Sequence, residues 1–140
     1  MATQSIYYAK NIASAAASGN SVTVTFTTAA IYPDIRIAEY SGLDTASPFD
    51  ASMGTVGSSA TSSSGPAATA NANDLLVGAN LVQTGTTGAG SGFTSRLITP
   101  GDADIFGDQI VAITGSYTAT APISPSAPWI MQIVAFKRHP

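Results

Sequence analysis

Three aspartates lie close together in the stretch Pro100-Gly-Asp-Ala-Asp-Ile-Phe-Gly-Asp108. Carboxylates spaced along a flexible loop suit the oxygen-rich coordination of calcium, so Asp102, Asp104 and Asp108 are candidate metal ligands. The spacing is not that of an EF-hand, and the glutamate that would end such a loop is missing. Glycine and aspartate are also common in turns, because glycine tolerates unusual backbone angles and aspartate hydrogen-bonds nearby backbone. We therefore favour a plain turn without a cofactor and keep a calcium site as the alternative.

Glu39 is the main candidate for a catalytic carboxylate, with Asp108 as a second. Glu39 has the same strand parity as Ile35 and Ile37, which would place it on the apolar face of a regular strand. A buried carboxylate needs a partner, and Arg96 is the available cation. A glycosidase would require two such carboxylates at a defined separation. We favour the alternative, in which the strand ends or bulges at Glu39 and leaves this side chain in water.

Several other chemistries lack the residues they require. The chain has no cysteine, which excludes disulfides, thiol catalysis and cysteine-based metal sites. A Ser-His-Asp hydrolase needs a histidine base, and the only histidine is His139, near a chain end where mobility is common. The five basic residues form no basic stripe, since three are single and two are adjacent at the C-terminal end, so nucleic acid is not an expected partner. These residues are Lys10, Arg36, Arg96, Lys137 and Arg138.

Tyrosines could bind sugars by stacking, and Tyr7, Tyr8 and Tyr117 are the candidate binding residues. Adjacent Tyr7 and Tyr8 point to opposite faces of an extended chain, so one of them should be exposed. Trp129 lies in a very apolar stretch and is expected in the core. The 17 serines and 17 threonines could contact polysaccharide through their hydroxyls, or could serve only as polar surface.

Alternating apolar and polar residues predict the strands that would position these side chains. The clearest case is residues 21–28, where Val22, Val24 and Phe26 share one face and threonines the other, as in a half-buried strand. Residues 74–82 are apolar on both parities and predict a strand covered on both sides, and residues 129–136 predict a central strand. Further strands are expected at residues 5–10, 31–40 with Ile35 and Ile37 inward, 93–99, 109–114 and 115–120. Residues 57–73 form an edge strand or a loop, and residues 12–17 could form a helical turn.

About eight strands separated by turn signals, without a useful amphipathic helix, predict one all-β domain over residues 1–140. The expected architecture is an antiparallel β-sandwich of jelly-roll or immunoglobulin-like type. Charged residues make up only 9% of the chain, against roughly 25% in an ordinary soluble domain. No apolar run approaches the roughly 20 residues that span a bilayer, and no signal peptide is recognised at the N-terminus. The chain is then either cytoplasmic or a piece of a longer exported precursor.

The order of several motifs resembles a widespread group of uncharacterised bacterial β-sandwich modules. The motifs are Glu39-Tyr-Ser-Gly-Leu-Asp44, then Ser47-Pro-Phe-Asp50, then Asn73-Asp-Leu-Leu76, and a closing strand from Trp129 to Lys137. The resemblance covers nearly the whole chain, although each motif alone has low specificity. It implies a module of a secreted or cell-surface protein, and therefore an extracellular location within a longer exported chain.

The resemblance also implies a missing part. Modules of this group begin with further strands before the segment that matches Ile6-Tyr7-Tyr8, so we expect exposed edges here and a homo-oligomer in which a neighbour covers them. The expected function is a non-catalytic structural or adhesive module, with carbohydrate contact as a further role and no membrane insertion. The alternative is a glycan-directed hydrolase that works through carboxylates and is supported by calcium.

Overall fold

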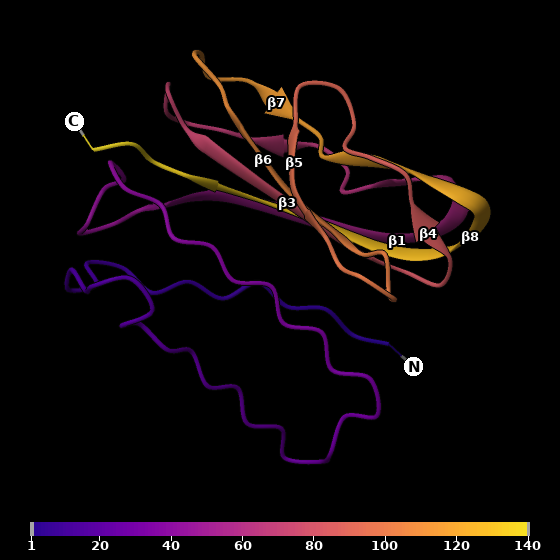
Figure 1. Cartoon of the computed structure of the whole chain (residues 1–140). Coiled ribbons are helices and arrows are strands. Elements are labelled where there is room, and N and C mark those ends of the chain that lie inside the picture. The colour runs from indigo at the N-terminus through magenta and orange to yellow at the C-terminus, as the bar shows by residue number, and fades with distance from the viewer. Residues whose placement is uncertain (1, 140) are drawn as a thin grey trace.

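The computed structural model describes residues 2–139, and these residues form eight strands and no helix. All strand pairs are antiparallel, which confirms the prediction of an all-β, antiparallel, sandwich-like fold (Figure 1). In chain order the strands are β1 (Phe49–Ser63), β2 (Ala67–Ala68), β3 (Leu75–Val82), β4 (Gly85–Thr86), β5 (Thr94–Ile98), β6 (Ile105–Ile110), β7 (Ser116–Tyr117) and β8 (Thr120–Phe136).

The long strand β8 organises the main sheet. The strand order β1-β8-β3-β6-β5 places it between β1 and β3, and β4 pairs with an earlier part of β8. The central position predicted for residues 129–136 is confirmed, because this half of β8 pairs with both neighbours. The burial predicted for residues 74–82 is also confirmed, since seven of the eight residues of β3 are buried. Apolar residues on both parities thus mark the strands that are covered on both faces of the sheet.

One face of the main sheet packs under the small β2–β7 ribbon. Leu76, Met131 and Ile133 form the centre of this core, and each is at most 2% exposed. Gly78 allows the covering chain to approach closely, because a Cβ built on it would lie 2.8 Å from the Cβ of Ala119. This face is a closed hydrophobic core.

Residues 2–43, called the N-terminal layer from here on, cover the opposite face. In Figure 1 this layer, indigo to purple, lies beside the strands as a separate set of extended runs. Ile6, Tyr40 and Leu43 pack against a second cluster of sheet residues, and the rings of Tyr8 and Phe136 meet edge-on at 5.4 Å. The cover is thin, because most of the layer remains exposed.

The strands predicted at residues 5–10, 21–28 and 31–40 are wrong. In the described chain, no backbone hydrogen bond joins these segments to one another or to the sheet. Residues 12–17 form no helix either, and a single bond from Gly19 N to Ala16 O closes a turn there. The alternating pattern produced extended chain, but an extended chain without a backbone partner is not a strand.

Two details of the sheet also differ from prediction. The strand expected at residues 109–114 is mostly wrong, because β6 runs from Ile105 to Ile110 and so includes Asp108, which was expected in a loop. The strand expected at 115–120 shrinks to β7. Residues 57–63 belong to the edge strand β1, whereas the following residues turn back through β2. The polar, small-residue composition of this region suits an edge that has only one partner.

Candidate functional site

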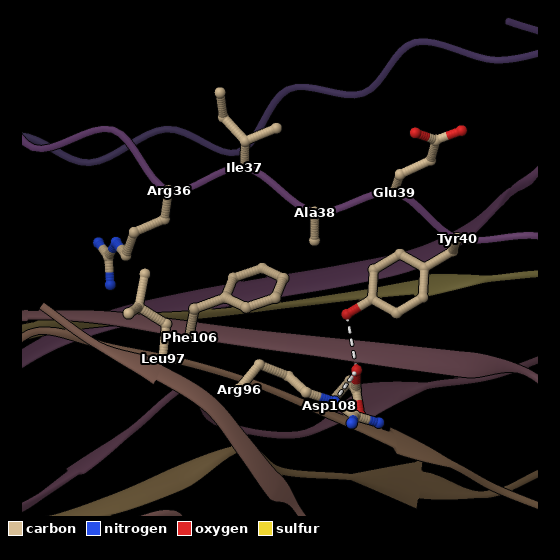
Figure 2. Close-up of a pocket in the computed structure, with 9 residues that line it drawn as sticks. All are labelled: Arg36, Ile37, Ala38, Glu39, Tyr40, Arg96, Leu97, Phe106 and Asp108. Atoms are coloured by element: carbon tan, nitrogen blue, oxygen red, sulfur yellow. Dashed lines mark hydrogen bonds and ion pairs between the residues drawn. The ribbon is translucent and has the colours of Figure 1, made fainter. Parts of the chain in front are cut away.

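Tyr40, Asp108 and Arg96 meet where the N-terminal layer crosses β6 and β5 (Figure 2). The Tyr40 hydroxyl donates to Asp108 Oδ2 at 2.7 Å, and Arg96 Nε donates to the same oxygen at 2.8 Å. The β5–β6 register shifts between Ser95 and Leu97, so Arg96 lies at a β-bulge. A bulge redirects a side chain, and here it accompanies a guanidinium aimed at the neighbouring strand.

The three groups fix one another's charge states. Burial raises the pKa of Tyr40, and its hydrogen bond to Asp108 raises it further, so the phenol stays protonated. Burial alone would raise the pKa of Asp108, but the hydrogen bonds from Arg96 and Tyr40 outweigh it and hold this pKa below 3.8. The hydrogen bond to Asp108 raises the pKa of Arg96. Each group therefore keeps the protonation state that its bonds need, and none is poised to exchange a proton near neutral pH.

A pocket of about 450 Å³ opens above this cluster, between residues 36–40 and strands β5 and β6. Glu39 and Asp108 both border it, but Figure 2 shows their side chains pointing apart. Ala38 and Tyr40 point toward the sheet, whereas Ile37 and Glu39 point away from it. The placement of Ile35 and Ile37 on the inner face was wrong, since they are 49% and 63% exposed. The even-numbered side chains face the sheet instead, because Arg36 and Tyr40 form hydrogen bonds with polar groups on the sheet.

Arg36 anchors the layer, a role that the sequence analysis missed. Its Nη1 donates to the carbonyl oxygens of Asn80 at 2.8 Å and Ile105 at 2.7 Å. Its Nε also forms an ion pair with Asp34 Oδ2 at 3.2 Å, and the Arg36 side chain is 10% exposed. The local pattern contained no signal for this role, because alternation with Ile35 and Ile37 predicts an outward-facing, solvated arginine.

A second pair of acids, Asp50 and Asp74, was also missed. Asp74 is fully buried, and neither of its carboxyl oxygens meets a hydrogen-bond donor in the described chain. Burial, followed by the neighbouring Asp50, raises the pKa of Asp74 to about 7. Asp50 accepts bonds at 2.7 Å from both Ala70 N and Asn71 Nδ2, which help to keep its pKa low despite some burial. A protonated Asp74 can donate to Asp50, and such a bond would fasten β1 to the turn before β3.

The aspartates proposed as calcium ligands are not brought together. Asp104 is buried and accepts from Val82 N at 2.7 Å, while Asp108 is engaged by Arg96 and Asp102 is exposed. Burial raises the pKa of Asp104 to about 6, against the bond from Val82. Among residues 2–139, no three histidine or acidic side chains gather closely enough to hold a metal ion.

The candidate sugar-binding tyrosines lie in different places. Tyr7 is 89% exposed on the N-terminal layer, whereas Tyr8 contacts Phe136. The Tyr117 ring packs against the core and its hydroxyl donates to Ile113 O at 2.7 Å. Trp129 is partly buried against the same core, as expected. The three tyrosines therefore form no common platform.

The motif around Gly42 links the layer to the C-terminal end of β8. Gly42 has a φ of 77°, which favours glycine, and its carbonyl oxygen accepts from His139 N at 2.9 Å. Asp44 Oδ1 accepts from the backbone N–H groups of Ala46 and Ser47, which closes the turn that follows. The backbone of His139 is thus tied to the layer, contrary to the mobility expected near the chain end.

No known protein family, curated protein or solved structure matches this chain. Among residues 2–139 there is also no helix of the length and apolarity required to cross a membrane. The Tyr40–Asp108–Arg96 cluster is a hydrogen-bonded clasp between the layer and the sheet, and it presents no activated nucleophile.

Proposed function

We propose that this chain is a non-catalytic structural module that joins other protein chains through its N-terminal layer. The observation that carries the proposal is the unpaired backbone of residues 21–28 and 31–40 in the described chain. Among residues 2–139, ten of the sixteen exposed large hydrophobic side chains lie between Tyr7 and Ile37. Extended segments with free backbone groups and apolar side chains accept a further strand by main-chain hydrogen bonding.

The module would act in a secreted or cell-surface protein, in an adhesive or scaffolding role, which is the setting that the motif resemblance implies. A hydrolase would need two carboxylates directed at one substrate. Glu39 points away from the sheet, and Asp108 is held by two donors, so the pocket offers no such pair (Figure 2). Strand acceptance is therefore the function that the geometry supports best.

The test uses a synthetic peptide of alternating valine and threonine, with lysines at its ends for solubility. Amide hydrogen exchange is measured on the protein with and without this peptide. We expect saturable protection of amides in residues 21–28 or 31–40, because new main-chain hydrogen bonds slow their exchange. Amides of β3 should not change, since they are already paired on both sides.

A matched peptide with proline at its centre is the control. Proline lacks the N–H donor and cannot continue a ladder, so this peptide should give no protection. Equal protection by both peptides, or no protection by either, would overturn strand acceptance as the function.

A further inference from the structure

We propose that residues 21–28 pair antiparallel with the same residues of a second copy of this chain, in a symmetric dimer centred on Val24. The inference rests on the proposed function of the N-terminal layer and names its partner and register. Three features of this segment support the choice: it has no hydrogen bond or ion pair to the sheet in the described chain, it carries no charge, and its side-chain pattern is symmetric.

Residues 21–28 are the part of the layer least committed to the rest of the chain. Gln4 donates to Ala79 O at 2.9 Å, and Arg36 and Tyr40 bond to the sheet, so the other two segments each have an anchor. In the described chain no side chain of residues 21–28 makes a hydrogen bond or an ion pair. Val22, Val24 and Phe26 are 59%, 45% and 48% exposed. Pairing with another chain would therefore break no hydrogen bond or ion pair of these side chains.

The segment also lacks the devices that normally protect a free edge. Natural edge strands carry charges, prolines or bulges that repel a further strand. Residues 11–33 contain no charged residue, and residues 21–28 contain no proline or glycine. Residues 31–40, by contrast, carry Pro33, Asp34 and Glu39. Two copies can thus approach along residues 21–28 without burying a like-charge pair.

The side-chain pattern is symmetric about Val24, so a second copy of the same segment matches it along its length. Antiparallel pairing through Val24 places Val22 opposite Phe26 and Thr23 opposite Thr25, so apolar side chains meet apolar ones. Pairs of an aromatic with a β-branched residue, and threonine pairs, each stabilise a sheet by about 0.2–1 kcal/mol. A symmetric interface uses one patch twice, as this pattern requires.

The dimer should depend on protein concentration. Eight paired residues bury less than the roughly 800 Å² per partner of a standard stable interface. The mass measured by sedimentation velocity should therefore rise from monomer to dimer as the protein concentration increases. A monomer at every concentration would overturn the inference.

Cysteine cross-linking tests the register, and the absence of native cysteine leaves no background. In this register the two Val24 Cα atoms lie about 4.5–5.5 Å apart, within the roughly 4.4–6.8 Å that a disulfide spans. Val24→Cys should therefore form a disulfide-linked dimer under mild oxidation. Phe26→Cys should not, because four residues of offset place the two cysteines at least about 13 Å apart.

A mixture of Val22→Cys and Phe26→Cys proteins gives the decisive result. We expect the two variants to cross-link to each other and neither to cross-link to itself. Self-linking of Phe26→Cys as readily as of Val24→Cys would show another register or random collision and would overturn the inference. Circular dichroism of each variant checks that the fold is intact. Failure of the cross-links together with specific protection by the valine-threonine peptide would overturn the partner while leaving the proposed function standing.

Discussion

Residues 21–28 and β3 (Leu75–Val82) are instructive to compare. Residues 21–28 alternate strictly between apolar and polar side chains, yet they form no strand, whereas β3 does not alternate and is paired along both edges. Alternation reports that a segment prefers to be extended with two different faces. Membership of a sheet depends instead on a neighbouring backbone that supplies donors and acceptors. The contrast supports the view that residues 21–28 are a strand that lacks its partner.

The two regions also differ in how they are held. The sheet has a closed core on one face, with Leu76 and Ile133 fully buried. The N-terminal layer is fastened mainly by separate polar contacts, such as those of Arg36 and Tyr40, and by a small apolar cluster. Opening the layer should therefore cost much less free energy than unfolding the sheet.

The largest expected effect is the difference in unfolding free energy between an isoleucine truncated in the core and one truncated in the N-terminal layer. Ile133→Ala should lower the free energy of unfolding by about 2–5 kcal/mol, because it leaves a cavity in the closed core. Ile37→Ala, at a side chain that is 63% exposed, should change it by less than about 0.5 kcal/mol. Urea unfolding of both variants measures the difference, and similar losses would contradict the distinction between the two regions.

Removal of the anchor should loosen the layer while the sheet stays folded. Arg36→Met keeps the length of the side chain but loses the bonds to Asn80 O and Ile105 O. Charged hydrogen bonds are worth about 1.5–3 kcal/mol each, so proteolysis within residues 2–43 should become much faster. Lys10→Met, at an exposed lysine that bonds Ala46 O, is the control and should have little effect. Equal cleavage of both variants would show that Arg36 is no anchor.

The buried acids of the sheet predict a fall in stability as the pH rises. The folded-state pKa of Asp74, about 7, lies above its ordinary value of 3.8, so the folded chain binds this proton more tightly than the unfolded chain. Stability from this proton is present below about pH 4 and is lost as the pH rises to about 7, with a slope of at most about 1.4 kcal/mol per pH unit.

Asp74→Asn should flatten this slope, because the amide donates to Asp50 at every pH. Asp104, with a raised pKa of about 6, should provide the slope that remains. Urea unfolding from pH 4 to pH 8 is the measurement. An unchanged slope in Asp74→Asn would place the titrating group elsewhere.

The smallest expected effect concerns the clasp between the layer and the sheet. Tyr40→Phe removes one of two bonds to the same oxygen of the Asp108 carboxylate, and because Arg96 still binds that oxygen the cost should be near the lower end for a charged acceptor, about 1.5 kcal/mol at neutral pH. The lowered pKa of Asp108 contributes stability that is lost on acidification, so the difference from the parent should shrink as the pH falls through that pKa. A loss of stability that is independent of pH would indicate that the hydroxyl acts only through packing.

The elements that the sequence predicted well are those with apolar residues on both parities, β3 and the second half of β8. Their composition requires burial on both faces, whatever the topology. The segments that alternate were predicted wrongly as paired strands, because a single chain pattern does not say whether a neighbour exists. The candidate site was predicted only in parts: Asp108 and Arg96 were named, but Arg96 was matched to Glu39. Which side chains of residues 36–40 face the sheet depends on where the sheet offers hydrogen-bond partners, and those positions are set only in the folded protein.

The sequence by itself determined the fold class, the absence of cysteine chemistry and the two strands that fill the centre of the sheet, since these follow from residue type and local pattern. The tertiary structure alone decided which polar side chains meet, because Asp50 and Asp74 are 24 residues apart in the chain and Tyr40 and Asp108 are 68 apart. It also decided that residues 21–28 remain unpaired. Hydrogen-bond partners and burial are long-range properties that arise only when distant segments pack together.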